Sequence, residues 1–259
     1  MDLIPGLIIV TILGLGWGSF ATMAIYRLPH NLPWIGNKPF CPSCKHSLSF
    51  RDYVSVISFL SRRGTCRYCG IEYGRRGLYL YTEIATTIVF IISFLVFNIS
   101  ETFILVTGLG TALVILSAIE IEHKQLHPKV LLILLILALI ARTLQDGSIY
   151  GIMYHGGLSA LVGLGIRHLY FLFKGRFKEG CDYLEYKEKD RFSGEGMSYV
   201  FLVTIAGIWL GVLPMLIVLL GAILFNILSS LLFIKRLFSL GFGLFWLGFI
   251  WYYGTVLIS

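Results

Sequence analysis

Several apolar runs of about 20 residues, separated by short charged stretches, dominate this chain of 259 residues. A run of that length is what an α-helix needs to cross the hydrocarbon layer of a bilayer. Composition agrees, because 57% of the residues are hydrophobic and 14% are charged, against roughly 45–50% and about 25% in soluble domains. The runs exclude a water-soluble core and predict a polytopic membrane protein.

The apolar runs predict an all-α fold with about eight transmembrane helices. They lie at 3–25, 79–97, 102–119, 129–143, 149–173, 197–212, 215–234 and 237–258. The first run is too long for a signal peptide, with no basic residues before it and no small-residue cleavage site after it, so we expect it to remain as a spanning helix. The predicted parts are this helix (1–25), a polar domain (26–78) and a helical bundle (79–259).

The net charge of +7 reflects where the basic residues stand, since 19 of the 21 Lys and Arg residues fall in alternate connecting segments. The positive-inside rule places those segments, and the polar domain with them, in the cytoplasm, and both chain ends on the other side. The basic excess is therefore a topology signal. No basic helix or aromatic ladder indicates a nucleic-acid partner.

Two CxxC pairs stand in the polar domain, CPSC at Cys41 and Cys44 and CRYC at Cys66 and Cys69, with 21 residues between them. Paired CxxC motifs are typical of a tetrahedral structural zinc site. A segment this short buries too little apolar surface to fold alone, whereas a four-cysteine zinc site supplies on the order of 10 kcal/mol of folding free energy. We therefore predict a small cytoplasmic zinc-binding domain between the first two helices.

Disulfides, idle thiols or a redox role are the alternatives for these cysteines. Reduction on the cytoplasmic side argues against disulfides. His46 could substitute as a ligand, but four thiolates already complete the shell. Cys181 stands alone and is interpreted as an ordinary thiol.

The N-terminal third of the chain resembles the type IV prepilin leader peptidases. The matching segments are GSFATMAIYRLP from Gly18, CPSCKHSL from Cys41, RDYVSVISFL from Arg51, GTCRYC from Gly64, and Glu83. The resemblance implies a bacterial inner-membrane aspartic peptidase of the GxGD class that cuts a leader from prepilins or type II secretion pseudopilins. It also implies, in many members, N-methylation of the new N-terminus with S-adenosylmethionine.

Peptide hydrolysis by carboxylates needs two acids within hydrogen-bonding reach, one ionised and one protonated. The segment SAIEIEHKQLHP, from Ser117 to Pro128, closes the third predicted helix. It resembles the family's I-D-x-x-H leading to a proline and places Glu120 at the Asp position. The alternative for Glu120, Glu122 and the histidines is a solvated helix end, with a metal site at the histidines as a weaker alternative.

The segment expected to carry the second catalytic acid departs from the family's pattern. The run RFSGEGMSYVFLVTIAGIWLG, from Arg191 to Gly211, resembles the family's E-x-M-G-x-G-D segment, but the catalytic Asp of GxGD is absent and Tyr199 stands there in one register. Glu195, just before the sixth predicted helix, is the nearest substitute, with Asp190 a few residues earlier. The predicted catalytic pair is Glu120 and Glu195.

Three functions remain open at this point. The first is a prepilin peptidase with unusual acids, acting on prepilin or pseudopilin N-terminal segments in the lipid bilayer. The second is a degenerate homologue that binds pilin-like partners without cutting them. The third, a carrier or channel, lacks the internal repeat or paired broken helices that would support it.

Overall fold

The computed structural model describes residues 3–33, 40–41, 43–47, 65–71, 76–123, 126–146, 148–177 and 192–231. In this part of the chain all extended regular structure is helical, and β-bridge residues occur at Phe40, Ser47 and Thr65, with Phe40 and Ser47 paired antiparallel. The chain divides into two compact units, Met1–His123 (unit 1) and Lys124–Ser259 (unit 2). The predicted all-helical class is confirmed.

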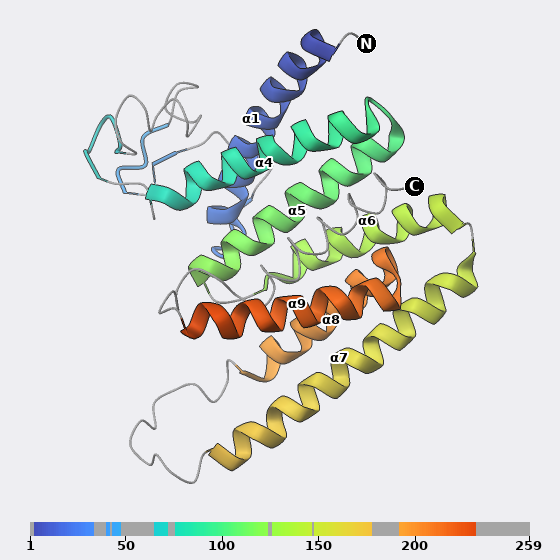
Figure 1. Cartoon of the computed structure of the whole chain (residues 1–259). Coiled ribbons are helices and arrows are strands. Elements are labelled where there is room, and N and C mark those ends of the chain that lie inside the picture. The colour runs from blue at the N-terminus through green and yellow to red at the C-terminus, as the bar shows by residue number, and fades with distance from the viewer. Residues whose placement is uncertain are drawn as a thin grey trace. The chain divides into compact units, whose positions relative to one another are not determined.

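Unit 1 contains three of the described helices and unit 2 contains four (Figure 1). In unit 1 they are α1 (Leu3–Arg27), α4 (Arg76–Phe97) and α5 (Glu101–His123). In unit 2 they are α6 (Pro128–Asp146), α7 (Ile149–Phe177), α8 (Phe192–Leu210) and α9 (Val212–Leu231). Each matches one predicted run, and the last predicted run, 237–258, lies outside the described residues.

Four helices are long and apolar enough to cross a membrane within the described ranges. They are Leu3–Arg27, Leu78–Phe97, Glu101–His123 and Ile149–His168. Two shorter apolar helices, Val200–Leu210 and Val212–Ala222, follow in unit 2. The protein is a membrane protein with four candidate spans in the described part, and the prediction of eight spans remains a prediction.

Glycines bring α1 and α4 into close contact in unit 1. A Cβ atom built at Gly14 would lie 2.9 Å from the Cα of Thr87, and one at Gly18 would lie 2.8 Å from the Cα of Glu83. The later glycine meets the earlier α4 residue, so the two helices run antiparallel. Small residues four apart let helix backbones approach in a membrane, where packing drives association.

Buried hydroxyls on α4 and α5 are satisfied within their own helices. Thr82, Thr86 and Ser93 on α4 each donate to the carbonyl four residues earlier, at 2.7–2.8 Å. Thr107 and Thr111 do the same on α5, at 2.7 and 2.8 Å. Because lipid offers no hydrogen bonds, this back-bonding lets polar residues sit inside a membrane helix.

The end of α5 differs from the prediction, which closed this helix at residue 119. The helix continues to His123, and nearly every residue from Val106 to Ile121 is buried. Glu120 therefore lies inside the last turns of a buried helix, and the alternative of a solvated helix end does not apply to it.

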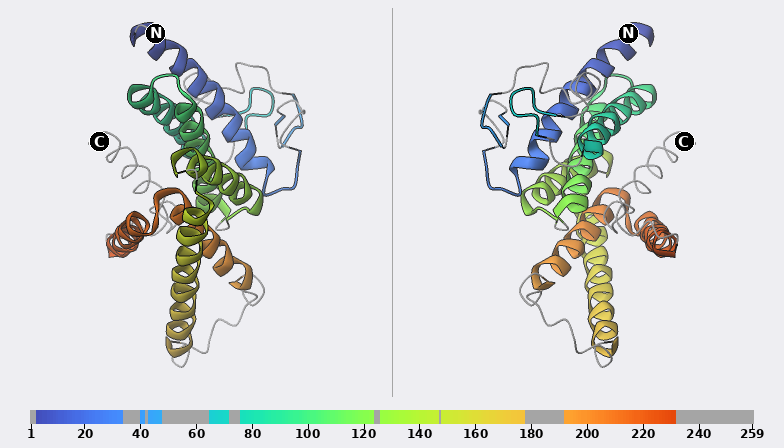
Figure 2. Two further views of the ribbon diagram at one scale, coloured as in Figure 1. Left: turned by 90° about the vertical axis from the view of Figure 1, so that its right-hand side faces the viewer. Right: turned by 90° about the vertical axis from the view of Figure 1, so that its left-hand side faces the viewer.

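In unit 2, α8 packs against α6, α7 and α9. The helix α7 is continuous through its glycines (Figure 2), and Gly163 contacts Val200 of α8. Gly211 has a φ of 87° and separates α8 from α9. His155 of α7 closes this junction, because its Nδ1 accepts a hydrogen bond from the Val212 N–H at 3.3 Å.

Candidate functional site

The four cysteines of the two CxxC pairs converge on one point in unit 1. Their Sγ atoms all lie within 4.8 Å of one another. Cys41 Sγ is 3.8 Å from Cys69 Sγ, and Cys44 Sγ is 3.9 Å from Cys66 Sγ. Disulfide sulfurs lie about 2.05 Å apart, whereas four sulfurs at about 2.3 Å from a central zinc are separated by about 3.8 Å. The group fits a tetrahedral metal ion and does not fit disulfides.

The backbone around each CxxC pair follows one pattern. The Cys41 N–H donates to the His46 carbonyl at 2.9 Å, and the Lys45 N–H donates to the Cys41 carbonyl at 3.0 Å. The second pair repeats both bonds from Cys66 and Gly70, at 2.8 and 3.0 Å. Lys45 and Gly70 occupy the same place in their turns and have φ of 59° and 69°. Two matching turns thus present two sulfurs each.

Crowding of the sulfurs affects their protonation. The backbone hydrogen bond from His46 lowers the pKa of Cys44, whereas desolvation and the three other thiols raise it, and the resulting pKa is about 11. A thiol with a raised pKa remains protonated at neutral pH until a bound cation displaces its proton. Cys44 therefore does not have the lowered pKa of a reactive thiolate.

Arg27, at the end of α1, contacts the segment that leads into the first CxxC pair. This side chain is buried, and its Nη1 donates to the Pro33 carbonyl at 3.0 Å. Its guanidinium carbon lies 5.4 Å from the ring centre of Phe40, which precedes Cys41. The Nζ of Lys45 lies 5.3 Å from the same ring. A cation on a ring contributes about 0.5–2 kcal/mol, so this contact joins the cysteine domain to the membrane helices.

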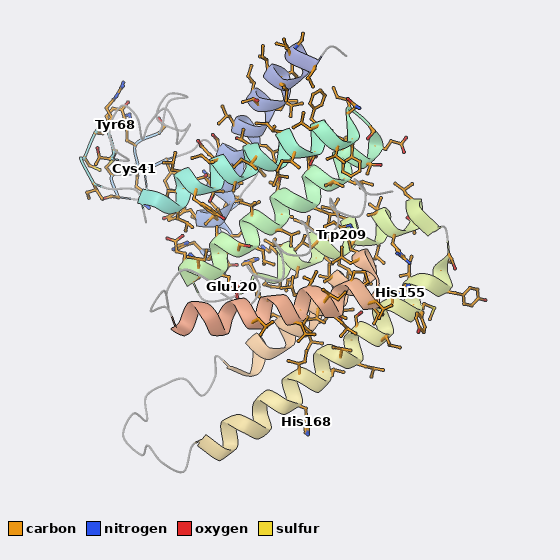
Figure 3. The ribbon with its side chains drawn as sticks, in the orientation of Figure 1. Cys41, Tyr68, Glu120, His155, His168 and Trp209 are labelled. Atoms are coloured by element: carbon orange, nitrogen blue, oxygen red, sulfur yellow. The ribbon has the colours of Figure 1, made fainter. Side chains whose placement is uncertain are left out.

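Glu120 is the predicted catalytic residue whose surroundings are described. It lies near the C-terminal end of α5 (Figure 3) and is 2% exposed. Neighbouring Glu122 and His123 are half-buried, as is His127 in unit 2. An ionisable side chain inside a membrane helix is costly and marks a functional site by default.

Glu195 belongs to unit 2 and lies in the first turn of α8, because this helix begins at Phe192 rather than after Glu195. Asp190 and Cys181 lie outside the described residues. The predicted pairing of Glu120 with Glu195 stays a prediction.

A second buried acid, Glu83, has a structural setting that the sequence did not indicate. Its side chain is fully buried in α4, and its Oε1 accepts a hydrogen bond of 2.7 Å from the Ser19 hydroxyl of α1. An acid inside an apolar run is a signal that was available, and the Gly14–Gly18 spacing indicated a close helix crossing. The hydrogen bond itself depends on helix register.

Comparisons with known proteins show similarity to prepilin-processing enzymes. Residues 12–97 match the family described as the bacterial peptidase A24 N-terminal domain. The chain is 32% identical over 126 residues to a prepilin leader peptidase/N-methyltransferase of Bacillus subtilis, a match covering 48% of this chain and 49% of that protein. It is 27% identical over 219 residues to one of Dichelobacter nodosus, covering 70% and 72%.

A type 4 prepilin-like proteins leader peptide-processing enzyme of Escherichia coli O78:H11 is 27% identical over 137 residues, covering 46% of this chain and 50% of that enzyme. The chain thus spans about half the length of the Escherichia coli and Bacillus relatives. No solved structure matches.

Proposed function

We propose that the chain is a divergent member of the prepilin leader peptidase family and that it cleaves the leader peptide from type IV prepilins or type II secretion pseudopilins. Its similarity to the family's N-terminal domain and to the curated relatives supports this proposal. The enzyme would be an aspartic-type membrane endopeptidase that uses glutamates. N-methylation of the new N-terminus is a second proposed activity, supported by the relatives that are named prepilin leader peptidase/N-methyltransferase. S-adenosylmethionine is the proposed methyl donor.

The burial of Glu120 carries the proposal. A side chain that is 2% exposed near the end of an apolar helix is difficult to explain as a solvated helix end. Its place in the sequence resembles that of the family's first catalytic Asp. Glutamate adds one methylene to aspartate, which moves the carboxylate by about 1 Å, and displacements of that size can cost about 100-fold in rate.

Glu195 is the proposed second acid. Its backbone lies in the first turn of α8, and a helix N-terminus stabilises a carboxylate. We assign Glu195 as the ionised base that takes a proton from water, and Glu120 as the protonated acid that polarises the scissile carbonyl. Two close acids divide in this way because both cannot ionise together.

Co-expression with a prepilin tests the activity through the mobility shift of the cleaved product. Glu120→Gln keeps the size of the side chain but removes the acid, so cleavage should be lost. Glu101→Gln, at the exposed opposite end of α5, is the matched control and should cleave normally. Glu120→Asp restores the family's residue and should retain or raise activity. Cleavage that survives Glu120→Gln and Glu195→Gln together would disprove the pair.

The cysteine group is proposed to bind one structural zinc ion through Cys41, Cys44, Cys66 and Cys69. The sulfur separations support this proposal. The purified full chain should contain one zinc per molecule, and Cys44→Ser should lower this content and the thermal stability. Wild-type protein without stoichiometric zinc, together with a four-serine variant of wild-type stability, would contradict it.

The proposed location is the bacterial inner membrane, with about eight spans and the cysteine domain in the cytoplasm. The support is the position of the basic residues, since 19 of 21 fall in alternate segments. A reporter inserted near Arg63 should behave as cytoplasmic, and one fused after Ser259 as external. The reverse pattern would overturn the topology.

A further inference from the structure

The two CxxC turns of unit 1 present an exposed surface made of rings, basic side chains and an aliphatic side chain. It consists of Lys45, His46, Arg67, Tyr68 and Ile71, called here the Tyr68 surface. The His46 ring of the first turn packs against the Tyr68 ring of the second, with the ring centres 3.5 Å apart. All five residues are exposed, and Figure 3 shows Tyr68 at the edge of the cysteine domain. The ring pair therefore joins the two turns into one surface.

The Tyr68 surface exposes large apolar side chains outside the helices. Tyr68 is 50% exposed and Ile71 is 51% exposed. Among the described residues, the one further case outside a helix is Ile99, which lies between α4 and α5. Apolar side chains exposed on spanning helices are explained by contact with lipid. That explanation does not cover a domain outside the helices, so the Tyr68 surface indicates an interaction with something beyond the domain itself.

The charge of the cysteine domain favours an anionic partner. Residues 26–78 contain nine Lys and Arg residues against two acidic residues, Asp52 and Glu72, whereas the rest of the chain contains twelve of each kind. The whole net charge of +7 therefore belongs to this domain. The exposed residues Lys45 and Arg67 are sequence neighbours of the two packed rings. Basic residues combined with exposed aromatic and aliphatic side chains are typical of surfaces that bind anionic membranes.

The cysteine domain is held close to one end of the membrane helices. It connects the last residue of α1, Arg27, to the first residue of α4, Arg76, and because these helices run antiparallel, both attachments lie at the same end of the pair. The guanidinium carbon of Arg27 lies 5.4 Å from the ring centre of Phe40, next to the first CxxC turn. Tethering of this kind gives lipid headgroups a high effective concentration at the domain, so a weak affinity is sufficient for contact.

We propose that the Tyr68 surface docks the cysteine domain onto the anionic phospholipid headgroups of the membrane that the chain spans. Lys45 and Arg67 pair with lipid phosphates, while the Tyr68 ring and the Ile71 side chain enter the boundary between headgroups and acyl chains. The inference rests on the proposed membrane location and does not depend on peptidase activity. Docking fixes the orientation of a domain that the chain otherwise attaches by its two ends.

Photo-crosslinking from position 68 of the full chain tests the contact. Tyr68 is replaced by p-benzoylphenylalanine, and the protein is illuminated in nanodiscs of phosphatidylcholine, alone or mixed with phosphatidylglycerol. Mass spectrometry should find at least about 5-fold more lipid adduct in the anionic nanodiscs, since each basic residue near an anionic surface contributes about that factor. In these nanodiscs Lys45→Gln should lower the adduct about 5-fold. The control Lys129→Gln, at an exposed lysine of α6, should leave it unchanged.

Four results would overturn the proposal. They are no lipid adduct in either nanodisc, equal adduct in both, a loss in Lys45→Gln no larger than in Lys129→Gln, and an adduct to another protein in place of lipid when the variant is illuminated in cells. The last result would assign the surface to a protein partner. The same probe at Ile71 should show the same lipid dependence, which keeps the test valid if the Tyr68 variant folds poorly. Lipid adduct without prepilin cleavage would support docking and count against the peptidase function, whereas cleavage without lipid adduct would do the opposite.

Discussion

The crossing of α1 and α4 gives a sharp test of the fold, because Gly18 of α1 lies at the contact whereas Gly16 lies away from it. Gly18→Ala adds a methyl group that would lie 2.8 Å from the Glu83 Cα and 3.2 Å from its carbonyl oxygen. Gly16→Ala adds the same methyl group where nothing lies within 4 Å. The two variants have the same chemistry and differ in their surroundings.

The magnitude follows from the clash. Carbon atoms pack best at about 3.5–4.0 Å, so α1 must retreat from α4 by roughly 0.7–1.2 Å to accept the Gly18→Ala methyl. Overpacking of this kind costs about 1–3 kcal/mol. Both variants gain up to about 1 kcal/mol from the better helix propensity of alanine. Gly18→Ala should therefore be less stable than Gly16→Ala by about 1–3 kcal/mol.

Thermal unfolding of the purified protein in one detergent measures the difference. At about 2–4 °C per kcal/mol, Gly18→Ala should have a Tm roughly 2–12 °C below that of Gly16→Ala, and Gly16→Ala should match or exceed wild type. Equal Tm values for the two variants would refute the close crossing. A loss of stability in Gly16→Ala but not in Gly18→Ala would mean that α4 contacts the Gly16 face of α1, contrary to the structure.

Two further predictions concern buried polar groups. Ser19→Ala removes the donor to Glu83 Oε1 and should lower the free energy of unfolding by about 0.6–2 kcal/mol, which denaturant titration would detect. Ser19→Thr keeps a hydroxyl and should lose less stability. Equal losses of stability in the two variants would contradict the hydrogen bond. Zinc affinity should fall as pH falls, because the pKa of Cys44 without metal is about 11 and protons compete with zinc for the thiolates below that pH. Chelator competition at two pH values would measure this fall in affinity. A zinc affinity that does not change with pH would contradict the prediction.

Helix positions in this protein could be predicted from apolar runs alone. The run at 79–97 became Arg76–Phe97, and the run at 129–143 became Pro128–Asp146. Turn-forming residues and charges bound these runs, so their ends are fixed locally. The cysteine group was equally predictable, because two CxxC pairs on one short segment have few ways to satisfy their ligands.

The surroundings of the acids could not be predicted in the same way. Hydropathy treats Glu120 as the end of an apolar run, whereas the structure places it within a longer helix at 2% exposure. Glu83 is bonded to Ser19, which lies 64 residues earlier, and that pairing depends on the crossing of two helices. A single sequence does not tell which residues of α1 lie opposite which residues of α4. That alignment becomes known only when the structure shows which α4 residues the glycines of α1 contact.

The hydrogen bond between Ser19 and Glu83 also has a consequence for how the protein enters the membrane. An acid in a spanning segment meets a barrier on leaving the aqueous phase, on the order of 2.5–3.5 kcal/mol for a charged residue at mid-helix. Chains are made from the N-terminus, so α1 is in place, offering its hydroxyl and the open surface at Gly18, when α4 arrives. The helix α1 thus serves as an insertion partner for α4. A fragment that begins at α4 would enter the bilayer without the Ser19 hydroxyl that bonds Glu83.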